Sequence, residues 1–187
     1  MEAKKIIIAG GATRIGAAIA RSLSGNEKQI TLHYNQSEKE AKKLKTELER
    51  DGAKVFLIKA DLSNSNSVKK IIPFSYKMMK GLDCLINNAS IFEKDSIKDF
   101  NESKFNKHMN INLKAPAILS QAFKKYVKNN KGNIVNIIDQ RIFKLTPYFF
   151  SYTLIKSGLE TLTKTSAMSL APNIRVNGIA PGPTIKN

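Results

Sequence analysis

The stretch that decides the fold is Ala9-Gly10-Gly11-Ala12-Thr13-Arg14-Ile15-Gly16. It follows a short β-branched run over residues 5–9 and leads into a helical pattern over residues 15–23. Gly10 permits a tight turn, and Gly16 lets the helix pack close to the strand. The amides at the start of such a helix can hold a pyrophosphate. The stretch therefore predicts a dinucleotide-binding turn, although glycine also serves other sharp strand-to-helix turns.

The same alternation of β-branched runs and helical patterns continues along the chain, which is typical of a parallel sheet with crossover helices. Ser37 and Glu40 are spaced as a helix capping box. We expect one domain over residues 1–187, a doubly wound α/β sheet that binds its ligand at the carboxyl ends of the strands. The expected strands are 5–9, 29–33, 55–59, 83–86, 133–138 and 174–179, and the expected helices are 15–23, one after Ser37, 65–79, 101–128 with a bend at Pro116, and 151–170.

Composition excludes several classes of protein. The net charge is +16, but 26 of the 31 basic residues are lysines spread along the whole length, whereas base and phosphate recognition favours arginine. We therefore expect a solvated lysine surface that attracts small anions, and no nucleic-acid partner. No apolar stretch reaches the ~20 residues of a membrane span. The single cysteine, Cys84, fits a reducing compartment, so we expect a cytoplasmic protein with no membrane contact.

Several further motifs follow the expected strands or lie on the expected helices, with Asn112 in the long helix and Tyr152 near the start of the helix that follows the fifth strand. In chain order they are Asp61-Leu62, Asn87-Asn88-Ala89-Ser90, Asn112, Tyr152-x-x-x-Lys156 and Pro181-Gly182. Together with the glycine turn, the chain resembles the short-chain dehydrogenase/reductases over all of its 187 residues. This resemblance implies a Rossmann-like fold and a nicotinamide cofactor.

The Tyr-Lys pair is the candidate catalytic motif. A second pair with the same spacing, Tyr76 and Lys80, precedes the fourth expected strand and lies at the wrong edge of the sheet. Tyr152, by contrast, begins a helix 13 residues beyond Asp139, and the i, i+4 spacing places Lys156 on the same helical face. A neighbouring ammonium lowers the pKa of a tyrosine, as a general acid beside a carbonyl or imine requires.

Three departures from the commonest short-chain pattern resemble the pteridine reductases and their dihydrofolate reductase-like relatives. They are Arg14 where a glycine is usual, Asp139 where a serine is usual, and Phe92 shortly after the fourth strand. A pterin is a flat, electron-poor bicycle on which Phe92 can stack. Asp139 offers a carboxylate to ring donors, and Arg14 offers a planar cation to a carbonyl or a phosphate. The alternatives are that Phe92 belongs to the core and that Arg14 is a plain surface residue.

The end of the second expected strand indicates the cofactor. An acidic residue there would bind the ribose hydroxyls of NAD, but His33, Tyr34, Asn35, Gln36 and Ser37 offer none. A 2′-phosphate is tolerated there, so we expect NADPH, although the pteridine reductase pattern usually has arginine where Gln36 stands.

The resemblance then implies a mechanism and a set of site residues. Hydride passes from NADPH to a C=N bond of a dihydropterin or dihydrofolate, and Tyr152 with Asp139 supplies the proton. Lys156 holds the nicotinamide ribose, and Asn112 either anchors a proton-relay water or stabilises a helix kink. No metal site is expected. Substrate contacts are expected from Arg14, Phe92, Asp139 and Tyr152, and cofactor contacts from Gly10, Arg14, Ile15, Gly16, His33, Tyr34, Asn35, Ser37, Asp61, Leu62, Asn88, Ala89, Ser90, Tyr152, Lys156, Pro181 and Gly182.

Members of this family continue several dozen residues past the Pro-Gly turn. We therefore expect that the seventh strand and the substrate lid are missing, and that stability and turnover are weaker than in a longer relative. Either the chain is a truncated or decaying gene product, or a homo-oligomer, which we expect, supplies the uncovered surface. Two other functions stay open. One is a carbonyl reductase, acting for example on 3-oxoacyl thioesters, in which serine rather than Asp139 is expected. The other is a non-catalytic remnant that binds nucleotide.

Overall fold

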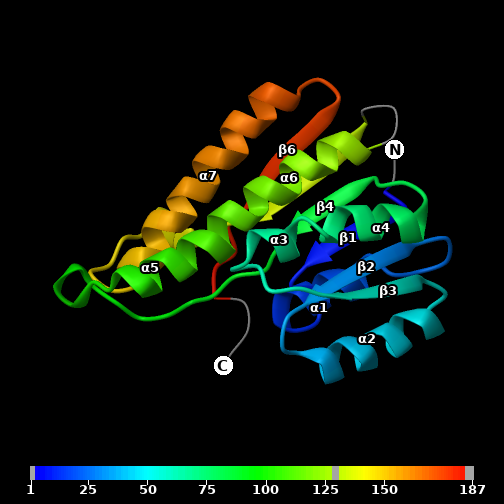
Figure 1. Ribbon diagram of the computed structural model, residues 1–187, viewed down its shortest axis with the longest axis horizontal. Coiled ribbons are helices and arrows are strands. Elements are labelled where there is room, and N and C mark those ends of the chain that lie inside the picture. The colour runs from blue at the N-terminus through cyan, green and yellow to red at the C-terminus, as the bar shows by residue number, and fades with distance from the viewer. Residues whose placement is uncertain (1–2, 128–130, 184–187) are drawn as a thin grey trace.

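The computed structural model describes residues 3–127 and 131–183. In these ranges six parallel strands form one sheet in the order β3-β2-β1-β4-β5-β6 (Figure 1). The direction of strand addition reverses between β1 and β4, which opens a crevice at the carboxyl ends of these two strands. The predicted doubly wound, Rossmann-like fold is confirmed. The strands are β1 (Lys5–Ala9), β2 (Gln29–Tyr34), β3 (Lys54–Lys59), β4 (Cys84–Asn87), β5 (Gly132–Ile137) and β6 (Ile174–Ile179).

Helices cover both faces of the sheet (Figure 1). One apolar cluster joins α1 and α2 to the face that carries Ile6 and Ile8, and the other joins α3, α4 and α6 to the face that carries Ile7. Because successive strand residues point to opposite faces, all three of these isoleucines are buried at 0–1% exposure. The α-helices are α1 (Arg14–Ser22), α2 (Glu38–Arg50), α3 (Ser65–Val68), α4 (Ile71–Met79), α5 (Glu102–Met109), α6 (Ala115–Tyr126) and α7 (Phe150–Leu170).

Two local predictions about helices were wrong. The helix expected over 65–79 is divided into α3 and α4. Pro73 has no N–H to donate to the carbonyl of Lys69, so the first turn of α4 does not continue α3. The capping box at the start of α2 is also absent, because the Ser37 side chain makes no hydrogen bond to the helix.

The helix expected over 101–128 is irregular in its middle. A five-residue π-helical segment, Asn110–Lys114, joins α5 to α6 immediately before Pro116. Residue 128, its expected end, lies outside the described residues. Such segments are frequent at functional sites.

The far edge of the sheet is formed by β6. Arg175, Asn177 and Ile179 of this strand are exposed, whereas Ile174 and Val176 face the helices and are buried. Within the described ranges, no helix is long and apolar enough to cross a membrane.

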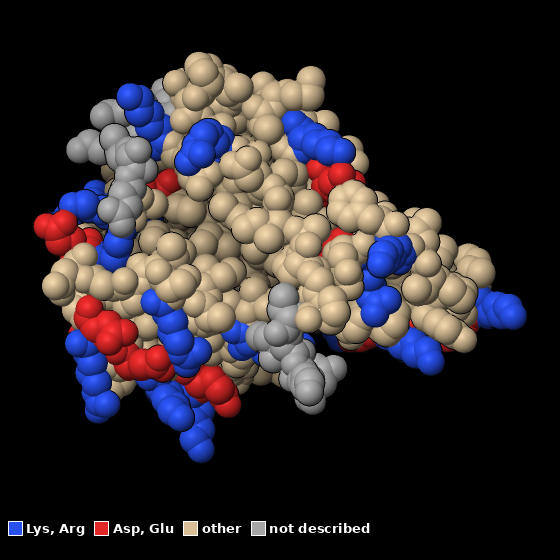
Figure 2. Space-filling view, turned by 180° about the vertical axis from the view of Figure 1, so that it is seen from behind, with Lys and Arg blue, Asp and Glu red and all other residues tan. Residues whose placement is uncertain are grey.

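Charged side chains are distributed over the surface. On the face seen in Figure 2, lysine and arginine side chains occur on several parts of the surface, and at the lower left, over α2, a group of them is mixed with acidic side chains. Two i, i+4 ion pairs, Lys42–Glu38 and Lys45–Glu49, account for part of that mixture. These exposed pairs contribute little to stability.

Candidate active site

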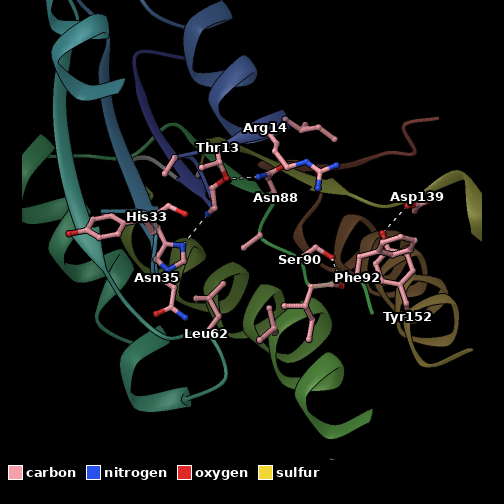
Figure 3. Close-up of a pocket in the computed structure, with 18 of the residues that line it drawn as sticks. Thr13, Arg14, His33, Asn35, Leu62, Asn88, Ser90, Phe92, Asp139 and Tyr152 are labelled. Carbon is pink, nitrogen blue, oxygen red and sulfur yellow. Dashed lines mark hydrogen bonds between the residues drawn. The ribbon is translucent and has the colours of Figure 1, made fainter. Parts of the chain in front are cut away.

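A cavity of about 870 Å³ lies at the carboxyl ends of the strands, beside the turn between β1 and α1 (Figure 3). It runs from the end of β2 to the start of α7, a span that suits an extended dinucleotide and a small partner molecule. Residues from every part of the predicted site line it: Gly10, Arg14, Ile15, His33, Tyr34, Asn35, Ser37, Asp61, Leu62, Asn88, Ala89, Ser90, Phe92, Asp139, Tyr152 and Gly182.

The glycine turn is tightly packed. Gly10 has a φ of +72°, and a Cβ there would lie 2.7 Å from the Cα of Ala89. A Cβ on Gly16 would lie 2.0 Å from the carbonyl oxygen of Gly10. Nδ2 of Asn88 donates to that same carbonyl at 2.7 Å. The two glycines therefore allow β1, α1 and the end of β4 to meet, as the turn was predicted to do.

His33, at the end of β2, forms a hydrogen bond with the glycine turn between β1 and α1 (Figure 3). Its Nδ1 accepts the N–H of Gly10 at 3.0 Å, so its Nε2 carries the proton and donates to the carbonyl of Ala60 at 3.0 Å. The ring is 2% exposed, and burial lowers the pKa of this histidine. His33 is therefore a neutral link between the ends of β1, β2 and β3.

Tyr152 and Asp139 form the polar centre of the cavity (Figure 3). The Tyr152 hydroxyl donates to Oδ2 of Asp139 at 2.8 Å. Burial raises the pKa of Tyr152 well above its usual value, and the hydrogen bond and negative charge of Asp139 raise it further, whereas a hydrogen bond with Ser90 lowers it. The prediction of a lowered tyrosine pKa is therefore wrong, because burial and the Asp139 carboxylate outweigh the hydrogen bond with Ser90 and the positive charge of Arg141.

Lys156 lies on the same face of α7 as Tyr152, one turn further on. Its ammonium is 5.6 Å from the centre of the Tyr152 ring and donates to the carbonyl of Ile137 at 2.7 Å. The residue is 2% exposed, and burial lowers its pKa to about 8. Lys156 stands beside the cavity lining rather than in it, and its contact with a nicotinamide ribose stays a prediction.

Asn112 lies in the π-helical segment and holds the chain that follows β4. Its Oδ1 accepts the N–H of Ile91 and its Nδ2 donates to the carbonyl of Ile91, both at 2.9 Å. The side chain is 1% exposed, next to the buried His108. This pair of bonds fixes the segment that carries Ser90 and Phe92, while a role for Asn112 in a water relay stays a prediction.

Aromatic rings enclose the wall opposite the glycine turn. Phe92 is half exposed and stacks on Phe149 at a centroid distance of 4.2 Å and an interplanar angle of 6°. The ring of Tyr152 meets Phe92 edge-on at 4.8 Å. The guanidinium of Arg141 lies 4.4 Å from the centre of Phe149 and 5.2 Å from that of Phe92. Phe92 is therefore no core residue.

The start of α7 is held by a carboxylate from the loop after β4. Asp95 is 4% exposed, and each of its oxygens accepts the N–H of Ser151 at 3.2 Å. The hydroxyl of Ser151 also donates to Asp95. Because Ser151 directly precedes Tyr152, this contact sets the position at which the tyrosine enters the cavity.

Sequence reasoning found most of the residues that line the cavity and missed others spread around it. Gly16, Asn112, Lys156 and Pro181 were predicted site residues that support the cavity without lining it. The carbonyl of Pro181 accepts the N–H of Gln140. Ala12, Thr13 and Gln36 stand within the glycine turn and at the end of the second expected strand, so the motifs already pointed to them. Gln140 and Arg141 lie in a loop without a motif, where only their proximity to Asp139 in the sequence could have indicated them. The missed lining residues are Ala12, Thr13, Gln36, Ser63, Ile91, Lys107, Ile111, Gln140, Arg141 and Pro183.

Comparison with known proteins agrees with this geometry. The model of the short chain dehydrogenase family matches residues 4–185. An uncharacterized oxidoreductase of Thermotoga maritima is 32% identical over 185 residues, which is 97% of this chain and 72% of that protein. The human dehydrogenase/reductase SDR family member 4 is 30% identical over 96% of this chain and 65% of its own length.

Solved structures give the same result. The FolM alternative dihydrofolate reductase 1 of Brucella suis, in complex with NADP, superposes with a TM-score of 0.91 and 38% identity, over 97% of this chain and 76% of that one. A blue fluorescent protein from a metagenomic library, in complex with NADPH, superposes with a TM-score of 0.92 and 28% identity, over 97% and 75%.

The chain therefore belongs to the short-chain dehydrogenase family, and it is an NAD(P)H-dependent short-chain reductase. It resembles the FolM alternative dihydrofolate reductases among the solved structures, and it spans about two thirds to three quarters of the length of these relatives.

Proposed function

We propose that this protein uses NADPH to reduce a C=N bond of a pterin or dihydrofolate-type substrate. The observation that carries the proposal is the hydrogen bond from the Tyr152 hydroxyl to Asp139, at 2.8 Å, beside the half-exposed ring of Phe92. A carboxylate at this position suits the ring donors of a pterin better than it suits a simple ketone. The likeness to FolM alternative dihydrofolate reductases supports the same assignment.

The residues of the cavity fit NADPH. The tight contacts of Gly10 and Gly16 form a turn at the N-terminus of α1, where the helix amides favour a pyrophosphate. Asn35 and Ser37, at the end of β2, offer neutral polar groups that tolerate a 2′-phosphate. The NADP and NADPH found in the similar structures support this choice. When bound, NADPH supplies the hydride, and the chain supplies the proton and the orientation.

The proton comes from Tyr152. Its raised pKa keeps the hydroxyl protonated at neutral pH, and Asp139 holds it at the edge of the cavity until the substrate nitrogen competes for it. Lys156 places a buried ammonium one helical turn away, where a positive charge stabilises the phenolate that forms. Arg14, which lines the cavity near the glycine turn, is assigned to the phosphate or to a substrate carbonyl.

The test is oxidation of NADPH, followed at 340 nm, with dihydrofolate and with dihydrobiopterin. Wild-type protein should turn over at least one of them, and Tyr152→Phe should reduce kcat by about 100-fold or more while NADPH affinity stays within a few-fold. Turnover of a 3-oxoacyl thioester alone would identify a carbonyl reductase instead. NADPH binding without any turnover would indicate a nucleotide-binding remnant.

We further propose a homo-oligomer in a reducing, cytoplasmic compartment. The exposed edge strand β6 offers a surface for a second copy of the chain. Cys84 is a buried free thiol, and burial raises its pKa to about 12, so it is an unreactive thiol that suits a reducing compartment. Light scattering on the purified protein tests the oligomer, and a monomer at micromolar concentration would contradict it.

A further inference from the structure

Arg141 is a cation on the substrate side of the cavity that the reductase proposal does not use. It belongs to a short 3₁₀ turn, Gln140–Ile142, that follows β5 directly. Its side chain lines the cavity and lies over the stacked rings of Phe92 and Phe149, at 5.2 and 4.4 Å from their centres. The aromatic faces hold the planar guanidinium in a defined place without using its N–H groups.

The backbone around Arg141 is fixed as well. Its N–H donates to Oδ1 of Asp139 at 2.9 Å, while Oδ2 of the same carboxylate accepts the Tyr152 hydroxyl. The N–H of Gln140 donates to the carbonyl of Pro181 at 3.2 Å. The backbone that carries the Arg141 side chain is therefore tied to the same carboxylate as the Tyr152 hydroxyl.

Within residues 3–127 and 131–183, no carboxylate lies within ion-pair distance of Arg141. The second cation of this part of the lining, Lys107, differs because it is paired with Glu93 at 2.8 Å. Arg141 thus offers several N–H donors at the substrate side of the cavity, where the Asp139 carboxylate is already engaged by the Tyr152 hydroxyl and by the backbone N–H of Arg141. A carboxylate is the group that matches such a planar fork.

We propose that Arg141 forms a subsite for a carboxylate carried by the substrate beyond its reacting ring. The inference rests on the proposed function and narrows it: among flat bicyclic C=N substrates, those with an anionic tail bind better than those with a neutral side chain. Dihydrofolate carries a p-aminobenzoylglutamate tail with two carboxylates, whereas dihydrobiopterin carries a neutral dihydroxypropyl group. Arg141 therefore selects folate-type over simple pterin-type substrates.

The experiment measures equilibrium binding of folic acid and of biopterin to the protein saturated with NADP⁺, by calorimetry, so that no turnover is needed. Wild type is compared with Arg141→Gln, which keeps a planar polar group but removes the charge. The matched control is Lys144→Gln. Lys144 is exposed, lies outside the cavity and stands three residues after Arg141, so this variant removes one positive charge without touching the proposed subsite. Arg141→Lys keeps the charge without the fork, and NADP⁺ affinity reports whether each variant is folded.

We expect Arg141→Gln to lower the affinity for folic acid about tenfold and the affinity for biopterin less than twofold. Lys144→Gln should change neither affinity. The affinity of Arg141→Lys for folic acid should lie between those of wild type and Arg141→Gln. The difference in folic acid affinity between wild type and Arg141→Gln should shrink as the salt concentration is raised from about 50 to about 500 mM. Equal losses for both ligands, no loss for either, or a wild type that prefers biopterin or binds neither ligand would overturn the subsite. If folic acid binds through Arg141 but dihydrofolate is never reduced, the reductase proposal fails and the subsite stands.

Discussion

The amide of Gly10 donates to Nδ1 of His33 at 3.0 Å, so a buried, neutral histidine at the end of the neighbouring strand stabilises the glycine turn. Protonation of Nδ1 would place two donors against each other. The folded pKa of His33 lies below the ordinary value of about 6.5, so the unfolded chain takes up a proton first as the pH falls. Stability that is fully present above about pH 7 is therefore lost as the pH falls from 6.5 through the folded pKa.

Urea unfolding of the cofactor-free protein between pH 5 and 8 measures this loss. His33→Phe should cost about 1–3 kcal/mol at pH 8, because Gly10 loses its acceptor, and should flatten the acid side of the profile. His108, the other histidine, also has a pKa lowered by burial, so His108→Phe serves as the control for its share of the slope. An unchanged slope in His33→Phe would show that His33 does not titrate as described.

Gly16→Ala should abolish tight NADPH binding. The new Cβ would lie 2.0 Å from the Gly10 carbonyl oxygen and 2.6 Å from Nδ2 of Asn88, so the turn must open. We expect NADPH affinity to fall more than about tenfold, measured by quenching or calorimetry. Gly158→Ala is the matched control, since its Cβ meets only the flexible side chain of Leu113 at 3.0 Å. Equal affinity in both variants would contradict the packing described.

Asp95→Asn should affect catalysis from outside the cavity. The amide has no charge and only one accepting oxygen, and its NH2 group would face the Ser151 N–H, so α7 loses part of its fixation, at a cost of about 1–3 kcal/mol in unfolding free energy. Because Tyr152 follows Ser151, kcat should fall several-fold more than NADPH affinity does. Asp99→Asn, in an exposed capping box of the same loop, should leave kcat unchanged. A drop in stability without a drop in kcat would limit Asp95 to a structural role.

Asp139→Asn should shift the pH profile of turnover. The carboxylate raises the pKa of Tyr152 through both its hydrogen bond and its charge, so the neutral amide lowers that pKa toward the ordinary value of about 10. The alkaline limb of kcat should therefore move to lower pH, and kcat itself should fall by about tenfold or more. The pH profile of Tyr152→Phe should show no alkaline limb. An alkaline limb that moves to higher pH in Asp139→Asn would contradict the role of Asp139 in raising the pKa of Tyr152.

Much of this molecule follows from its sequence. The strands 5–9 and 174–179 begin and end where the β-branched runs do, and the glycine turn falls at the predicted end of β1. These features are local, because each depends on a residue type that strongly restricts, or in the case of glycine widens, the backbone conformations available at its position. The family motifs then indicate the fold class, since several of them follow the ends of strands and the others lie on the two helices expected beside the site.

The remainder depends on contacts that no local pattern encodes. The division between α3 and α4 at Pro73 could have been read from the sequence, whereas the π-helical segment around Asn112 depends on its bonds to Ile91. The direction of the Tyr152 pKa shift depends on how deeply α7 buries the ring, which spacing alone does not give. Arg141 lies in a loop with no motif, so its place over two aromatic rings emerges only from the fold.

One carboxylate, that of Asp139, holds both the proton-donating hydroxyl and the backbone of the turn that carries Arg141. Replacing it with serine would change the acid–base chemistry and release the turn in a single step. If the proposed function and the proposed subsite hold, a substitution at Asp139 alters the acid–base group and the substrate contact together. A variant designed to reduce ketones would then need changes in residues 140–142 as well as at Asp139.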